Sequence, residues 1–176
     1  MEPFKADIER IRERAREKMN RGAVTGGYRG DREQVIRVLN DVLATEIVCV
    51  LRYKNHYFMA SGINNKPVAQ EFLEHANEEQ QHADLVAERI TQLGGVPNLD
   101  PANLATRAHA SYSEGSTLAE MIREDLVAER VAVQLYGDIV RWLGNDDPTT
   151  RRLMESLLEK EEEHADDLAD LLEEVG

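Results

Sequence analysis

Two Glu-x-x-His pairs are the residues of this chain best suited to bind metal. Glu79 and His82 form one pair, and Glu161 and His164 form the other, 82 positions later. At about 100° per residue, both pairs fall within apolar stripes and should face the core of the helices that carry them. Because burying a carboxylate or an imidazole costs free energy unless it is paired, these four side chains need partners inside the protein.

Each pair has a single glutamate upstream at almost the same distance. Glu46 precedes Glu79 by 33 residues, and Glu129 precedes Glu161 by 32. Both glutamates interrupt apolar stripes. Seven residues after each of them a tyrosine lies on the same helical face, Tyr53 and Tyr136. The pattern indicates a duplicated two-helix unit whose polar core residues occupy corresponding positions in the two copies.

Four long helices are predicted to carry these residues. They are expected to begin at Asp31, Asn65-Lys66-Pro67, Thr117 and Asp147 and to end at Ser61-Gly62, Gly94-Gly95 and Gly144. The first and last connections are short, whereas residues 96–115 are too long for a hairpin between adjacent helices. We therefore expect an all-α, antiparallel four-helix bundle with one long crossover, which contains a short helix at residues 103–109.

The first 30 residues are expected to form a helical extension before a bundle domain at residues 31–176. An amphipathic helix is predicted over residues 3–21, followed by a glycine-rich linker. Over residues 2–21, seven basic residues stand against five acidic ones. The mixed signs favour an accessory helix that packs on a neighbouring surface over an arm that binds DNA, because phosphate binding needs clustered positive charge.

Composition and net charge indicate which partners and which cellular compartment the protein is expected to have. The chain has 176 residues and a net charge of −13, which argues against general affinity for nucleic acid and suits binding of cations. Its single cysteine cannot form an internal disulfide. No signal peptide and no apolar run of about 18 residues is recognised. We therefore expect a cytoplasmic protein without a membrane-bound segment.

Facing helices of the predicted bundle bring six side chains to one level of the core: Glu46, Glu79, His82, Glu129, Glu161 and His164. Four buried carboxylates would repel one another or bind protons, and two divalent cations would balance their charge. Carboxylates with one imidazole for each metal suit iron or manganese rather than structural zinc. In the duplicated arrangement each metal has its own glutamate and histidine, and Glu79 and Glu161 are free to bridge.

Over roughly residues 32–174, the chain resembles bacterioferritin and its Dps-like relatives in the ferritin superfamily. The resemblance rests on the six ligand positions, the His-Ala-Asp sequence that occurs at both histidines, the tyrosine seven residues after Glu46, and the LGGVPNL segment. It implies a ferritin-like bundle with a ferroxidase centre. Such a centre binds two Fe(II) ions, oxidises them with O2 or H2O2, and passes ferric product into a protein shell that stores or detoxifies iron.

Carried over by position, the resemblance gives each candidate residue a role. It implies that the terminal ligands are Glu46 and Glu129, the bridging ligands Glu79 and Glu161, and the imidazole ligands His82 and His164. Tyr53 resembles the tyrosine beside the centre, which donates a hydrogen bond to a ligand and is a candidate electron source.

Two departures from the family pattern change the expected assembly. Bacterioferritin has a haem-ligating methionine directly after the glutamate of the second helix, and Gln80 stands there in this chain, so haem is not expected. Only 12 residues follow His164, which leaves no room for the short fifth helix of 24-subunit shells. A homo-oligomeric shell of 12 subunits is therefore favoured, with a site inside each chain rather than between subunits as in Dps itself.

Five further residues receive an interpretation from the sequence. His75 is expected to be an ordinary, partly buried histidine rather than an extra ligand or hydrogen-bond partner, and His56 and His109 to be surface residues. Cys49 is interpreted as a small buried residue, the alternative being a thiol near iron that can be oxidised. Tyr136 is equally compatible with a second hydrogen-bond donor and with simple core packing.

Two other functions compete with the ferroxidase hypothesis. One is a different iron or manganese enzyme on the same scaffold that removes peroxide; the absence of rubredoxin-type cysteines weakens its rubrerythrin-like version. The other is a DNA-protecting shell that acts through the N-terminal helix.

Overall fold

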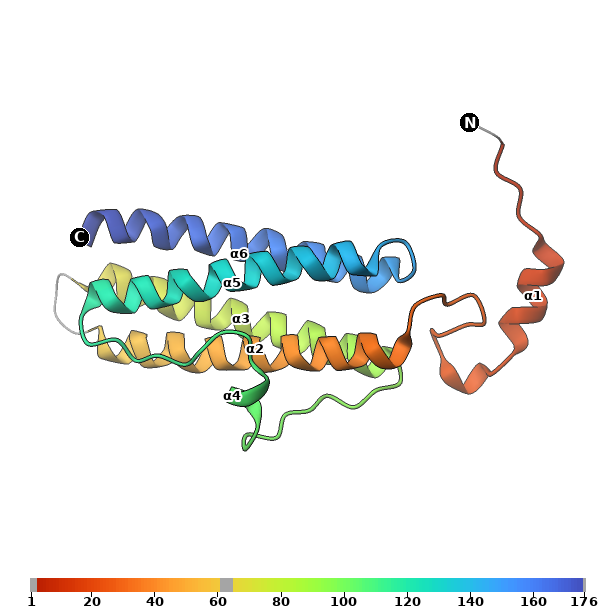
Figure 1. The fold of residues 1–176 in the computed structure, drawn as a ribbon, viewed down its shortest axis with the longest axis horizontal. Coiled ribbons are helices and arrows are strands. Elements are labelled where there is room, and N and C mark those ends of the chain that lie inside the picture. Colours follow the sequence, from red (N-terminus) through yellow and green to blue (C-terminus); the bar gives the residue numbers. More distant parts are fainter. Residues whose placement is uncertain (1–2, 61–64, 176) are drawn as a thin grey trace.

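The computed structural model describes residues 3–60 and 65–175. Helices are the only regular secondary structure in that part of the chain. Four long helices form an antiparallel bundle (Figure 1): α2 (Arg32–Met59), α3 (Lys66–Gln92), α5 (Leu118–Leu143) and α6 (Pro148–Val175). Helix α2 packs on α3, and α5 packs on α6. The expected all-α bundle with one long crossover is confirmed.

Side-chain caps set the starts of three bundle helices. Asp31 accepts the backbone N–H of Gln34 at 3.1 Å, and Thr117 accepts that of Glu120 at 3.2 Å. Asp147 accepts the N–H of Thr150 at 2.9 Å before α6. These bonds satisfy N–H groups that have no partner inside the helix. Helix α2 ends at Met59, and the predicted stop at Ser61-Gly62 lies outside the described residues.

Two hydrophobic clusters fill the bundle, one on each side of its middle. The first contains fourteen buried residues: Val35, Leu39, Val42, Leu43, Ala83, Val86, Ile90, Leu93, Ala132, Tyr136, Ile139, Leu143, Met154 and Leu157. The second contains ten: Cys49, Tyr53, Val68, Phe72, Ala76, Ala110, Met121, Ile122, Ala128 and Leu168. Along α2 the first cluster lies before Glu46 and the second after it. The polar side chains predicted at the middle of the core therefore lie between two hydrophobic clusters.

The crossover runs along the bundle and is fixed by hydrogen bonds to α2. Arg107 donates to the backbone oxygens of Asn40 at 2.7 Å and of Asn98 at 2.8 Å. Asn40 Oδ1 accepts the N–H of Asn98 at 2.6 Å. The short helix of the crossover, α4 (Leu104–Arg107), covers fewer residues than predicted and places Leu104 against α2.

The N-terminal helix is shorter than predicted. Helix α1 (Ile8–Arg16) is followed by a separate 3-10 turn, η1 (Met19–Arg21), because Lys18 adopts a left-handed backbone conformation with φ of 47°. Figure 1 shows α1 beyond the end of the bundle at which α2 begins. No residue of α1 is buried within the chain. The division of the chain at residue 30 stays a prediction.

Candidate metal centre

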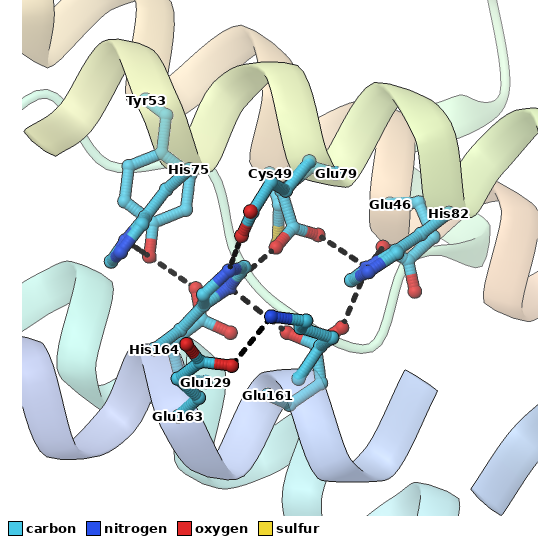
Figure 2. A network of polar contacts seen from close by, with 12 residues as sticks. Glu46, Cys49, Tyr53, His75, Glu79, His82, Glu129, Glu161, Glu163 and His164 are labelled. Carbon is cyan, nitrogen blue, oxygen red and sulfur yellow. Dashed lines mark hydrogen bonds and ion pairs between the residues drawn. The ribbon is translucent and has the colours of Figure 1, made fainter. Parts of the chain in front are cut away.

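The six side chains predicted to bind metal meet at the middle of the bundle, one or two from each long helix (Figure 2). Each of these six residues is at most 6% exposed. Helix α2 contributes Glu46 and α5 contributes Glu129, whereas α3 and α6 each contribute a Glu-x-x-His pair. Residues three positions apart lie on one helical face, so both members of each pair point inward.

The six residues form two overlapping groups with metal-ligand spacing. Glu46 and His82 belong to one group and Glu129 and His164 to the other, and both groups contain Glu79 and Glu161. One ligand atom from each member lies within 4.8 Å of the others in its group. The two shared carboxylates therefore lie where a bridge between two neighbouring cations would be.

The two histidines present the same nitrogen to the centre. His82 Nδ1 lies 3.0 Å from Glu161 Oε1 and 3.5 Å from Glu46 Oε2. His164 Nδ1 lies 3.1 Å from Glu79 Oε1. The matched orientation of the two rings follows the duplication that the sequence indicates.

Glu78 is a residue that sequence reasoning missed. Its Oε2 lies 2.6 Å from His164 Nε2, on the side of the ring away from the centre. A carboxylate there fixes the ring tautomer, with hydrogen on Nε2 and the Nδ1 lone pair free for a cation. The corresponding position of the other repeat holds Lys160, which pairs with Glu163 at 2.6 Å. The position that corresponds to Glu78 therefore carries no carboxylate in the other repeat.

Buried atoms without hydrogen-bond partners converge on this point. They are Glu46 Oε2, Glu79 Oε1, both carboxylate oxygens of Glu161, and the Nδ1 atoms of His82 and His164. A buried polar atom without a partner costs about 1–3 kcal/mol. Oxygen and imidazole lone pairs that face one another suit divalent cations of the iron and manganese type. The residues present therefore fit a pair of such cations.

Burial raises the pKa of Glu79 well above its ordinary value, and the carboxylates of Glu161, Glu46 and Glu129 add to this effect. The pKa of Glu161 is also raised well above the ordinary value, first by burial and then by Glu129 and Glu46. Without a cation, the two shared carboxylates thus favour their protonated forms. Binding of divalent cations would displace those protons.

Each tyrosine of the duplicated unit donates to the glutamate of the other copy that is predicted to be a terminal ligand. Tyr53 of α2 donates its hydroxyl hydrogen to Glu129 Oε1, and Tyr136 of α5 donates to Glu46 Oε1. Burial raises the pKa of both tyrosines well above the ordinary value. Tyr136 is therefore a hydrogen-bond donor, one of the two interpretations that the sequence left open.

The comparison with protein families agrees with the helical fold. A family model described as a ferritin-like domain matches residues 36–175, most of the chain. The chain belongs to this ferritin-like family.

Relatives of this ferritin-like chain include a bacterioferritin and a protein named for DNA binding. A bacterioferritin of Mycobacterium avium is 32% identical over 149 residues, which span 82% of this chain and 86% of the relative. A nutrient stress-induced DNA-binding protein of a Synechococcus species is 31% identical over 144 residues, or 79% of this chain and 81% of the relative.

Two solved structures resemble this chain in the same way. A dodecameric thioferritin, the bacterioferritin-related protein of Bacteroides fragilis, superposes with a TM-score of 0.79 and 32% identity, covering 84% of this chain and 89% of that one. Dps of Thermosynechococcus elongatus superposes with a TM-score of 0.76 and 25% identity, covering 80% and 90%. The resemblance to bacterioferritin and Dps that the sequence indicates is confirmed.

The prediction that His56 lies on the surface of this ferritin-like bundle is wrong. The side chain is 0% exposed, and Asp125 Oδ2 lies 2.7 Å from its Nδ1. The other oxygen of Asp125 accepts a hydrogen bond from Arg52 Nε at 2.7 Å. Arg52 also donates to the backbone oxygen of Ser111 at 2.9 Å. This buried network joins α2, α5 and the crossover.

Three other side chains with a predicted environment are those of His75, Cys49 and His109. His75 is 2% exposed, more deeply buried than expected. Its Nδ1 forms a hydrogen bond with the Tyr53 hydroxyl at 3.3 Å, so the expectation that it is not a hydrogen-bond partner is wrong. Cys49 is buried as expected, and burial raises the pKa of its thiol. His109 is exposed, as predicted, with Nδ1 3.0 Å from the Thr45 hydroxyl.

No described helix combines the length and apolar character needed to cross a membrane.

Proposed function

We propose that this protein is a ferroxidase that binds two Fe(II) ions in each chain and oxidises them with O2 or H2O2. The observation that supports the proposal best is the convergence, at the middle of the bundle, of buried ligand atoms that have no hydrogen-bond partner. Four carboxylates balance the charge of two ferrous ions. The proposed ligands are Glu46, Glu79, His82, Glu129, Glu161 and His164.

The two ferrous ions are the substrate. Their oxidation releases two electrons, which convert O2 and two protons to H2O2, or H2O2 and two protons to two molecules of water. The protein's part is to hold the ions side by side and to exclude bulk water. Glu79 and Glu161 would bridge the ions and give up their protons as the ions bind, because burial raises the pKa of both carboxyls.

The tyrosines position the terminal ligands. Tyr53 donates to one oxygen of Glu129, and Tyr136 donates to one oxygen of Glu46. The second oxygen of each glutamate is then free for a cation. Hydrogen bonds of this kind orient ligands and tune their basicity. Tyr53 is in addition our candidate for a side chain that supplies an electron.

We further propose that the chain assembles into a homo-oligomeric shell, of 12 rather than 24 subunits, in which ferric product is stored or detoxified. The dodecameric thioferritin of Bacteroides fragilis supports the smaller shell, and bacterioferritins among the relatives support a role in iron storage. The exposed apolar edge of α1, which includes Ile8 and Ile11, is available to a neighbouring subunit. Mass measurement of the assembled particle tests the subunit number.

Anaerobic titration with Fe(II), followed by exposure to O2 or H2O2, tests the ferroxidase proposal. Binding should saturate at two ions per chain, and ferric absorbance should then rise quickly. Glu161→Gln should lose much of the binding and the fast oxidation. Glu162→Gln is the matched control, because Glu162 is the next residue of α6 and is exposed. Wild-type behaviour of Glu161→Gln would contradict the proposal.

Metal analysis of protein purified without added iron distinguishes the ferroxidase from the alternative enzyme. Manganese in the centre together with rapid turnover of H2O2 would favour a peroxide-removing enzyme on the same scaffold. Iron with stoichiometric consumption of the oxidant would favour the ferroxidase.

A DNA-protecting shell is a second candidate function. One relative is named a DNA-binding protein, and α1 exposes Arg10, Arg12 and Arg16 in this structure. A gel-shift assay at low salt, repeated after deletion of residues 1–30, tests the idea. The full-length chain should retard DNA and the shortened chain should not; no shift with the full-length chain would eliminate this function.

A further inference from the structure

His75 of α3 lies beside one half of the centre but is not one of its proposed ligands. Its side chain is buried, and its ring stacks on the ring of His164 with centroids 4.1 Å apart and planes 20° apart. Its Nδ1 faces the Tyr53 hydroxyl at 3.3 Å. Figure 2 shows these rings next to each other at one side of the polar network. The other ring nitrogen, Nε2, is therefore directed away from Tyr53.

Two carboxylates face this second nitrogen. Nε2 of His75 lies 3.5 Å from Glu71 Oε1 on α3 and 3.8 Å from Asp167 Oδ2 on α6. Both distances are too long for a good hydrogen bond, and no shorter polar contact to this nitrogen is found among the described residues. One ligand atom from each of the three residues lies within 4.8 Å of the others. The side chains of Glu71 and Asp167 are 34% and 49% exposed, so the group opens to solvent.

The duplication shows that helix packing does not require polar residues here. Positions 82 residues apart in α3 and α6 correspond, as Glu79 and Glu161 do. In the other half of the bundle, the positions that correspond to Glu71, His75 and Asp167 hold leucine in all three cases: Leu153, Leu157 and Leu85. Leu157 is 1% exposed and belongs to the first hydrophobic cluster. A buried imidazole between two carboxylates has therefore replaced ordinary core packing in one half only.

We propose that Glu71, His75 and Asp167 bind a third divalent cation next to the Glu129 and His164 half of the centre. The neutral imidazole would supply one nitrogen ligand and the two carboxylates one oxygen each, and solvent would complete the coordination. This donor set suits Fe(II), Mn(II) or Zn(II). Because the site is open, its cation exchanges with solvent more readily than the central pair. Its presence makes the two halves of the centre inequivalent.

Zinc alone is a suitable probe, since it is redox-inert and its position can be read from anomalous scattering. Crystals of the full chain soaked in Zn(II) should show a third anomalous peak between Glu71, His75 and Asp167, in addition to the central pair. The third peak should disappear in His75→Leu and in the double variant Glu71→Gln/Asp167→Asn. His75→Leu copies the leucine of the other repeat, and the double variant alters only partly exposed side chains. Glu74→Gln, an exposed carboxylate on the same helix, should keep all peaks.

Equilibrium dialysis tests the same inference in solution by measuring the Zn(II) bound per chain. Wild-type protein should retain one more Zn(II) per chain than either variant. A filled central pair without a third peak in the wild type would overturn the inference, and so would a third peak that persists in both variants. A third peak without the central pair would support this inference and would contradict the proposed function, so the two can fail separately.

Discussion

Tyr136 of α5 donates a hydrogen bond to Glu46 of α2, and Tyr53 of α2 donates to Glu129 of α5. The two bonds cross the bundle in opposite directions and link the two copies of the duplicated unit. Each holds one oxygen of a terminal glutamate at the level where the other proposed ligands meet.

Tyr136→Phe should weaken cation binding mainly at the half that contains Glu46 and His82. Loss of a hydrogen bond that orients a ligand typically costs about 10–100-fold in metal affinity. Titration with Fe(II) under anaerobic conditions measures this as one weakened binding step. Tyr57→Phe, which changes a tyrosine of α2 outside the centre, is the control. Equal affinity of Tyr136→Phe and wild type would contradict the positioning role.

Glu78→Gln should weaken the other half of the centre. Its carboxylate contacts His164 Nε2 at 2.6 Å and fixes the tautomer that leaves Nδ1 free. We expect affinity at the Glu129 and His164 half to fall by about 10–100-fold. Lys160→Gln changes the corresponding residue of the other repeat and should have little effect. An equal loss in the two variants would show that Glu78 has no special role.

The metal-free protein should become less stable as pH rises above the ordinary glutamate pKa of 4.5. The pKa values of Glu79 and Glu161 are raised in the folded state, first by burial, so these two groups bind more protons in the folded protein than in the unfolded chain in this window. His75, whose pKa burial lowers to about 3, acts in the opposite sense up to its ordinary value of 6.5, but it is one group against two. The free energy of unfolding must then fall with increasing pH until the raised pKa values are passed.

Urea denaturation of metal-free protein at a series of pH values measures this effect. Glu161→Gln should reduce the slope, because the amide cannot titrate, and Glu162→Gln should leave it unchanged. A slope that is the same in Glu161→Gln and in wild type would show that the centre does not cause the pH dependence.

Bound cations should reverse this loss of stability. A ligand that binds only the folded state stabilises it by about 2.7 kcal/mol at a concentration of 100 times Kd. Addition of Mn(II), which O2 does not readily oxidise, should therefore raise Tm, and a chelator should return it to the metal-free value. The rise should be larger at pH 8 than at pH 5, because fewer protons have to be displaced. A Tm that does not respond to Mn(II) would speak against a buried cation pair.

Asp125→Ala should destabilise the bundle strongly. The change leaves Arg52, which is 1% exposed, without its buried carboxylate partner. Removing one partner of a buried ion pair costs about 3–5 kcal/mol. Asp138→Ala in the same helix is the control, because Asp138 is 73% exposed and its ion pair with Arg141 is at the surface. Denaturant unfolding of both variants measures the difference, and equal stabilities would contradict a structural role for the Asp125 network.

The helices and the six proposed ligands could be predicted from the sequence because their signals are local and repeated. A 3.6-residue apolar period, capping residues such as Asp31, and two Glu-x-x-His pairs all lie within a few turns of helix. The duplication then places Glu46 and Glu129 at corresponding positions. Agreement between the two copies makes each assignment stronger than a single motif would.

The sequence pattern does not predict contacts between distant parts of the chain or the backbone conformation of a single residue. The burial of His56 depends on Asp125, which is 69 positions away on another helix. The contact between Glu78 and His164 depends on how closely α3 and α6 approach, and helix periodicity alone does not give that distance. The end of α1 depends on the backbone conformation of Lys18, for which the side-chain pattern carries no signal.

All six proposed ligands come from a single chain. A subunit therefore needs no neighbour to complete its chemistry, and oxidation and confinement of the product become separable tasks. Surface changes that split the proposed shell into free monomers should leave the rate of oxidation intact. What a free monomer would lose is an enclosed space, so its ferric product would precipitate in the surrounding solution.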